Sequence, residues 1–294
     1  MDKNKENDIE KIFGMNRMMF FIIIILICVL ALSIGIYSTF FYRYSKKDPF
    51  MLGVGIKNSQ EEEEISNLRT NFPNIFKNNA NNIEGTTTVQ NIKRLDNSKE
   101  ELVYTISGID KQEDNYNVNV KIPRINISSS NTDKINAEIN RTFSEKAKNI
   151  MDSSNNNVHY DYNVTYKAYL NGHVLSLIIN ETEHGNEPQT TRIYTYNINL
   201  NTSTSVSVSE ILQAKKYSLQ EVQNEIDDEI KELNKKDEDL KKNYSNIKIR
   251  DTNNPMYKLE NTTNFMVNSD GYVYIIYAYG NNEKTTKMDV LIFK

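Results

Sequence analysis

Cysteine and histidine are scarce in this chain, which has one cysteine and three histidines among 294 residues. The cysteine, Cys28, lies inside an apolar run. The rest of the chain therefore has no disulfide, no thiolate nucleophile and no cysteine ligand for a metal. A zinc site needs three or four ligands, and His159, His173 and His184 form no His-x-x-x-His pair. We therefore expect neither a metal site nor a cofactor.

The short motifs of common catalytic sites are missing as well. The sequence has no Gly-x-Ser-x-Gly, no phosphate-binding loop and no Gly-x-Gly-x-x-Gly. Its 35 basic and 39 acidic residues are interleaved, so no basic patch of the kind that binds nucleic acid is present. We expect a protein that is not an enzyme and that has no nucleic-acid partner.

One long apolar run stands out near the N-terminus. Residues 18–42 carry no charge, and as a helix they would be about 37 Å long, enough to cross a hydrocarbon core of about 30 Å. Phe40, Phe41 and Tyr42 supply aromatic residues at one end. No small-x-small cleavage site follows them. The sequence predicts an uncleaved signal anchor, a single transmembrane helix that makes the membrane a partner.

Charges near this run bear on its orientation. Four basic residues precede it and three follow it closely, so the positive-inside count is nearly balanced. Long C-terminal domains translocate largely regardless of flanking charge. We expect residues 1–17 to be a short cytoplasmic N-terminus and the C-terminal domain to be extracytoplasmic, on the cell membrane of a Gram-positive bacterium. Residues 43–85 would be a juxtamembrane linker in which a short helix ends near Pro73.

The rest of the chain has alternating strand patterns and helical apolar stripes. We expect an α+β fold of antiparallel sheets with packed helices, preceded by the transmembrane helix. Asn171-Gly172 predicts a type I′ turn of a hairpin, and Ser207 or Ser209 is the expected cap of a helix. Two subdomains are expected, at 86–154 and 155–294. The expected strands are 87–95, 100–109, 115–125, 160–170, 173–183, 191–200, two runs within 263–280 separated by a turn at Ser269-Asp270-Gly271, and 287–293. The expected helices are 129–152 and 218–243.

Two groups of residues are candidates for ligand binding. His184 and Asn186 flank Gly185 between two strands, and Gly185 is expected to supply a positive φ while its neighbours tie the loop by side-chain to backbone bonds. The same loop could contribute to a ligand surface on a rigid sheet. The second group is a set of tyrosines that forms either a half-buried sheet face or an aromatic platform for a glycan or protein. These tyrosines are Tyr160, Tyr162, Tyr166, Tyr194 and Tyr196.

The order of the expected elements and several short sequence stretches in the C-terminal part resemble those of a known family. His184-Gly185-Asn186, then Tyr196-Asn197-Ile198-Asn199-Leu200, then Ser209-Glu210-Ile211-Leu212 follow its pattern. The chain thus resembles the paired extracytoplasmic domains of the lysozyme-sensing anti-sigma factors, the RsiV family. It is similar as well to the non-catalytic front half of peptidoglycan deacetylases of the PdaC kind. The resemblance covers roughly residues 87–294 and no deacetylase domain, so it carries over no catalytic residue.

From this resemblance we expect a non-enzymatic domain that binds a cell-envelope ligand. The ligand would be a lysozyme-like protein or peptidoglycan. Residues 1–17 are neutral and residues 43–48 carry +2, so from Pro49 onward the chain carries −6. This charge would steer a cationic partner weakly. Two alternatives remain, a regulatory membrane protein acting through its span and short N-terminus on another subunit, and a domain related to wall-glycan hydrolases or deacetylases.

Overall fold

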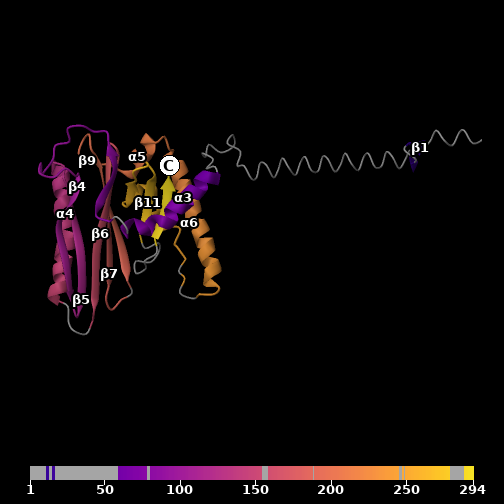
Figure 1. Cartoon of the computed structure of the whole chain (residues 1–294). Coiled ribbons are helices and arrows are strands. Elements are labelled where there is room, and N and C mark those ends of the chain that lie inside the picture. Colours follow the sequence, from indigo (N-terminus) through magenta and orange to yellow (C-terminus); the bar gives the residue numbers. More distant parts are fainter. Residues whose placement is uncertain are drawn as a thin grey trace, which may run out of the picture. The chain divides into compact units, whose positions relative to one another are not determined.

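The chain forms two compact units, residues 1–62 and 63–294. In the first, β1 (Lys11–Ile12) and β2 (Met15–Asn16) pair in antiparallel fashion. The apolar run 18–42 lies outside the described residues. No helix within the described ranges has both the length and the apolar character to cross a membrane. The computed structural model, shown in Figure 1, describes residues 11–12, 15–16, 59–77, 80–153, 158–187, 189–244, 247, 249–278 and 288–294.

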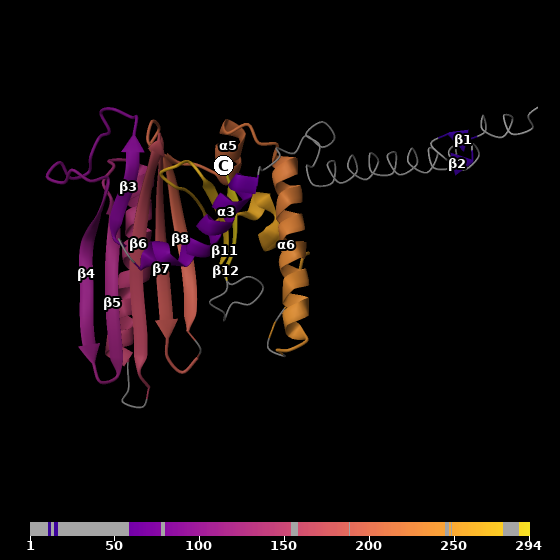
Figure 2. The ribbon, with the colours of Figure 1, turned by 45° about the vertical axis from the view of Figure 1, so that its right-hand side comes forward.

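The second unit is an α+β domain built on two sheets. In Figure 2 the large sheet is seen with helix α3 (Ser59–Asn71) crossing its front and α6 (Leu219–Lys241) standing beside it. The small sheet contains β10, β11 and β12. The strands are β3 (Asn82–Thr87), β4 (Val103–Glu113), β5 (Tyr116–Ile125), β6 (Tyr160–Gly172), β7 (Val174–His184), β8 (Thr190–Asn199), β9 (Thr204–Ser205), β10 (Phe265–Val267), β11 (Val273–Ala278) and β12 (Met288–Phe293).

The large sheet is mixed, so the prediction of antiparallel sheets holds for only part of it. Its order is β4-β5-β6-β7-β8-β9, with β3 also paired to β6. The neighbouring hairpin strands are antiparallel, as expected, but β5–β6 and β3–β6 are parallel pairs. Helix α4 (Ser130–Ser153) explains the first of these, because it carries the chain back along the sheet before β6 begins. The sheet thus continues across residue 155, where a subdomain boundary was expected.

Strands β5 and β3 share one edge of β6, one after the other. β5 pairs with residues 160–164 of β6 and β3 pairs with residues 167–172. Between them the Asn81 side chain accepts a bond from the Tyr166 amide at 3.1 Å, while the Asn81 amide donates to the Tyr166 carbonyl. Of the strand predicted at 87–95 only Thr87 is in a strand, at the end of β3, and residues 88–95 are irregular chain. Gly85, at φ 88 and close to the Leu170 carbonyl, permits the tight approach of β3.

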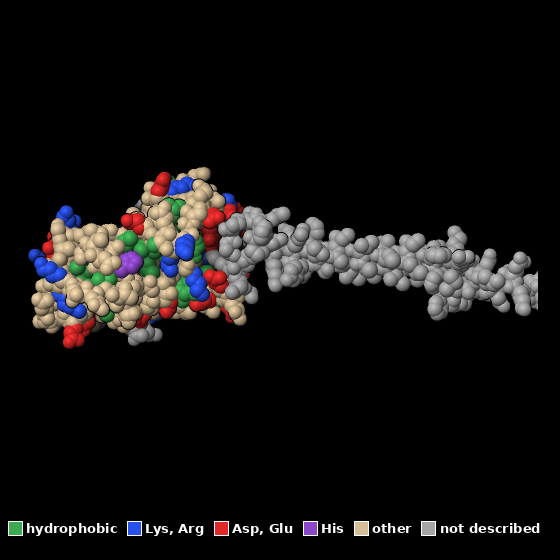
Figure 3. Space-filling view, turned by 90° about the horizontal axis from the view of Figure 1, so that it is seen from above, with side chains coloured by type: hydrophobic (Ala, Val, Ile, Leu, Met, Phe, Trp, Pro, Cys, Tyr) green, Lys and Arg blue, Asp and Glu red, His purple; other side chains and the backbone are tan. Residues whose placement is uncertain are grey.

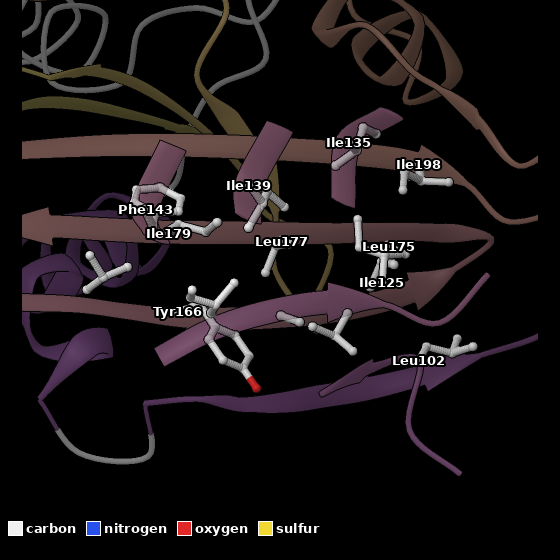
Figure 4. Packing of buried hydrophobic residues seen from close by; sticks show 14 of the residues in the cluster. Leu102, Ile125, Ile135, Ile139, Phe143, Tyr166, Leu175, Leu177, Ile179 and Ile198 are labelled. Carbon is white, nitrogen blue, oxygen red and sulfur yellow. The ribbon is translucent and has the colours of Figure 1, made fainter. Parts of the chain in front are cut away.

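Helix α4 packs along one face of the large sheet. Its apolar residues Ile135, Ile139 and Phe143 lie over Leu175, Leu177, Ile179 and Ile198 of the sheet, as Figure 4 shows. These positions recur every three to four residues, which is the spacing of one helix face. The predicted helix at 129–152 is therefore confirmed, and its stripe forms the main core of the domain.

The small sheet is covered on both faces. One face packs on α5 (Val208–Ala214) and α6, together with the short 3-10 helices η2 (Pro255–Tyr257) and η3 (Leu259–Asn261). The other face packs on α3 and on the large sheet through residues such as Ile178 and Ile193. Ser207 caps α5 in a reciprocal arrangement with Glu210, which confirms one of the two predicted caps.

The β6–β7 turn differs from its prediction, whereas the end of α3 agrees with its prediction. The hairpin turn between β6 and β7 was expected at Asn171-Gly172, but Asn171 pairs with Val174, so the turn residues are Gly172 and His173. Only Gly172 has a positive φ, whereas a type I′ turn needs two such residues. The helix ending near Pro73 is as predicted, because α3 stops at Asn71 and the 3-10 helix η1 (Phe72–Phe76) follows.

Candidate functional site

The His184 loop closes the antiparallel pair β7–β8. His184 and Asn186 are exposed, and no side-chain hydrogen bond joins either of them to another described residue. Gly185 does not have a positive φ, contrary to expectation. A Cβ at Gly185 would instead meet the Tyr160 ring at 2.5 Å, so the glycine leaves room for that ring. The three histidines do not gather, since His159 and His173 lie beyond opposite ends of β6.

The five candidate tyrosines do share one sheet face, but helix α4 covers much of it. Tyr162 and Tyr166 are each only 1% exposed, so they belong to the core and offer no platform to a ligand. The Tyr166 hydroxyl lies 3.0 Å from the Thr105 hydroxyl of β4. In Figure 4 the Tyr166 oxygen points away from helix α4. Tyr194 and Tyr196 are half-buried, and Tyr160 packs against Gly185.

Acidic residues near His184 are engaged in an ion-pair cluster beneath α4. Lys146 of α4 binds Glu181 and Glu183, each at 2.7 Å. The Tyr194 hydroxyl donates to Glu181 at 2.9 Å. Burial and the negative charge of Glu181 raise the pKa of the Tyr162 hydroxyl. His184 lies on the opposite face of β7 from Glu181 and Glu183, because side chains alternate between the two faces of a strand. These groups therefore do not converge as an acid–base set.

The opposite face of the large sheet mixes apolar residues, such as Ile178 and Ile193, with polar ones, and its polar residues fall into two halves. In one half, strand β10 covers the sheet and takes up its polar groups. The Asn197 amide donates to the Phe265 carbonyl at 2.7 Å, the Val267 amide donates to the Ser176 hydroxyl at 3.0 Å, and the Phe265 amide donates to the Thr195 hydroxyl at 3.1 Å. Side chains of β7 and β8 thus bind the backbone of β10 as a neighbouring strand would.

The other half lies beyond β10, and within the described ranges its polar side chains are not paired. Cross-strand pairs place these residues side by side, Asn163 with Thr182, Thr182 with Thr191, and Thr165 with Asn180. Asn180 and Thr191 are only 9% and 7% exposed. None of the five side chains has a hydrogen-bond partner among the described residues. We call these five residues, Asn163, Thr165, Asn180, Thr182 and Thr191, the polar strip.

The polar strip is the floor of a groove with a volume of about 670 Å³, within the range of small-molecule sites. One wall is the η1 segment, with Phe72, Pro73 and Phe76, and Leu233 of α6 also lines the groove. Phe72 is buried and Phe76 half-buried, so an apolar surface stands next to a row of amides and hydroxyls. Such a mixture of apolar walls and a few oriented polar groups is typical of ligand sites.

Two arginines line the groove and differ in how they are paired. Arg69 uses Nη1 to bind Glu229 at 2.6 Å, while its Nε is buried without a partner within the described part of the chain. Arg250 is fully engaged, with Asp289 through two bonds of 2.8 and 2.6 Å and with Asp237 at 2.6 Å. Burial would lower the pKa of Arg250, but the two carboxylates outweigh it and raise the pKa. Arg69 is therefore the less fully paired of the two arginines, and its side chain is 34% exposed against 2% for Arg250.

Comparison with known proteins adds no relative, since no family model and no curated protein matches the chain.

The polar strip was missed when the strands were judged from sequence alone, because its residues resemble an ordinary wet sheet face. A signal was present in β7. Its first half, Val174–Ile179, is apolar on both sides apart from Ser176, and its second half, from Asn180 to His184, is polar throughout. That switch indicates a strand that is covered by apolar elements on both faces in its first half only. The switch in β7 does not show which element covers the first half of the strand, and so the sequence could not locate the groove.

Proposed function

We propose that this chain is a single-pass membrane protein whose extracytoplasmic domain, residues 63–294, binds a cell-envelope ligand without transforming it. The apolar run 18–42 would anchor it, with residues 1–17 in the cytoplasm. The observation that carries the binding proposal is the polar strip. A buried polar group without a partner costs about 1–3 kcal/mol. Within the described chain the Thr165 hydroxyl is such a group, and Asn180 and Thr191 in the same groove are more than nine-tenths buried. A ligand or bound water offsets that cost.

A binding role is favoured over catalysis by the ionisable groups of the groove. Asp289 is the one carboxylate among its described lining residues. It is held by Arg250 and accepts a bond from the Tyr257 hydroxyl at 3.1 Å. A general base needs a lone pair directed at the substrate. Both oxygens of Asp289 instead accept hydrogen bonds from Arg250 or Tyr257. The proposal therefore assigns the groove to recognition.

A wall-directed cationic protein such as lysozyme is the second candidate ligand. The resemblance to lysozyme-sensing proteins and the charge of −6 from Pro49 onward support it. On the face seen in Figure 3 the acidic and basic side chains are interspersed, which fits weak steering better than a strong electrostatic contact. The groove favours the peptidoglycan fragment over the protein, because its floor is neutral.

The test is calorimetric titration of the full chain in detergent micelles, once with lysozyme and once with a mixture of soluble muropeptides. We expect saturable heat with muropeptides at a Kd of micromolar order. Saturable heat with lysozyme alone would keep the envelope-binding role and transfer it to the second candidate. Absence of heat with both, from protein whose circular dichroism shows a folded domain, would overturn the proposal. The regulatory alternative, which acts through the span, would then be the one to pursue.

A further inference from the structure

We infer that the groove binds a small ligand that carries both secondary amides and a carboxylate, with the amides on the polar strip and the carboxylate at Arg69. The inference rests on the proposed envelope-binding function and names the chemistry of its ligand. Acetamido groups of a sugar and peptide bonds share this amide chemistry, and a muropeptide contains both.

The amide part of the inference comes from the covered half of the same sheet face. There Ser176, Thr195 and Asn197 bind the backbone N–H and C=O groups of β10. The polar strip continues this face on β7 and β8 with the same residue types, threonine and asparagine. Because hydroxyls and carboxamides both donate and accept, they match a ligand that offers N–H and C=O together. The ligand would thus take over the role that β10 has in the covered half.

Burial separates the polar strip from an ordinary wet surface. Asn180 and Thr191 are more than nine-tenths buried, and both line the groove. The Thr165 hydroxyl is buried as well and lacks a partner among the described residues. A ligand in the groove would exchange the waters on these partly enclosed side chains for direct bonds. Phe76 stands over the floor as an apolar neighbour for a sugar ring face or a peptide side chain.

The carboxylate part comes from Arg69. Glu229 occupies only Nη1 of its guanidinium, and the Arg69 side chain is 34% exposed. Guanidinium groups bind carboxylates in a bidentate manner through two neighbouring N–H groups. The other groove arginine, Arg250, is saturated by Asp237 and Asp289. A ligand carboxylate would therefore be directed to the η1 end of the groove, where Lys77 adds positive charge.

The experiment compares three soluble probes on the full chain in micelles, by calorimetry. The probes are a muropeptide, its free stem peptide and a neutral oligomer of N-acetylglucosamine. The double variant Thr182→Val, Thr191→Val removes two floor hydroxyls at nearly constant volume, and we expect it to weaken the muropeptide about tenfold. Thr190→Val is the matched control, because Thr190 is next to Thr191 but on the opposite face of β8. It should leave all affinities unchanged.

The carboxylate is tested with Arg69→Met. We expect the muropeptide and the stem peptide to lose about tenfold or more in affinity, while the neutral oligomer keeps its own. Glu229→Gln removes only the ion-pair partner of Arg69 and should not weaken any probe. A muropeptide that binds the folded floor variant as tightly as wild type would overturn the groove assignment and leave envelope binding intact. Equal losses for neutral and anionic probes in Arg69→Met would overturn the carboxylate assignment.

Discussion

Position 185 requires glycine because the Tyr160 ring lies close to it, and not because its φ is positive. A Cβ there would lie 2.5 Å from the Tyr160 ring, far inside van der Waals contact. Gly185→Ala should therefore destabilise the domain by about 1–3 kcal/mol, the usual range for overpacking. Urea unfolding followed by circular dichroism measures this. Adding Tyr160→Ala should recover most of the loss in Gly185→Ala, and a double mutant with additive losses would contradict the contact.

A second residue-scale prediction concerns two aspartates of α6. Asp237 is buried and binds Arg250, whereas Asp239 binds Lys242 in solvent, with side-chain exposures of 9% and 69%. Asp237→Asn leaves Arg250 partly unpaired in the interior, so we expect a loss of about 3 kcal/mol in unfolding free energy. Asp239→Asn, the matched control on the same helix, should cause no measurable change, because exposed pairs contribute little. Equal effects in urea titrations would contradict the role given to burial.

At the scale of elements, the junction of β3 and β5 on β6 depends on Asn81. Its side chain accepts from the Tyr166 amide, and its φ of 62 is one that asparagine and glycine tolerate best. Asn81→Ala loses the bond and the favourable backbone conformation, at a cost of about 2–3 kcal/mol. Asn81→Gly loses only the bond, at about 1 kcal/mol. Unfolding curves of both variants give the two contributions, and the same loss in each would leave no role for φ.

The sequence predicted the elements better than their pairing. Alternation in β6 and β8, the apolar run that begins β7 and the apolar stripe of α4 are patterns that each segment carries by itself, so these elements could be predicted. The parallel partner β3 could not, because "NIEGTT" has few apolar residues and pairs with a strand about 85 positions later. The polar strip is similar. Its residues were visible, but their lack of partners depends on where β10 ends, which is a tertiary fact.

For the whole molecule, the wall of the groove is also the segment nearest the predicted membrane anchor. Residues 59–77 form α3 and η1, which pack on the domain through Ile65 and Phe72 and through the ion pair of Arg69 with Glu229. A ligand held at Arg69 would contact α3. The wall of the groove, the expected linker and the proposed anchor are thus adjacent in sequence.

The stability of the whole domain should fall steeply at alkaline pH, because many of its tyrosines are buried. Burial raises the pKa of Tyr274 and of Tyr277 to about 12, and burial also raises the pKa of Tyr166, Tyr169 and Tyr257. A folded-state pKa above the unfolded value of about 10 means that the folded state holds the proton more tightly. This contribution is complete below pH 10 and is lost as the pH rises through the folded pKa.

Two pKa units correspond to about 2–3 kcal/mol, so Tyr274 and Tyr277 each contribute that much stability that disappears by pH 12. We expect the urea midpoint to be constant from neutral pH to about pH 9 and to fall sharply above pH 10, with tyrosinate absorbance appearing together with unfolding. Tyr274→Phe should make this fall shallower, whereas Tyr244→Phe, at an exposed position, should not. Tyrosinate absorbance that develops near pH 10 in a still folded domain would mean that these hydroxyls are accessible to water, against the packing described for the small sheet.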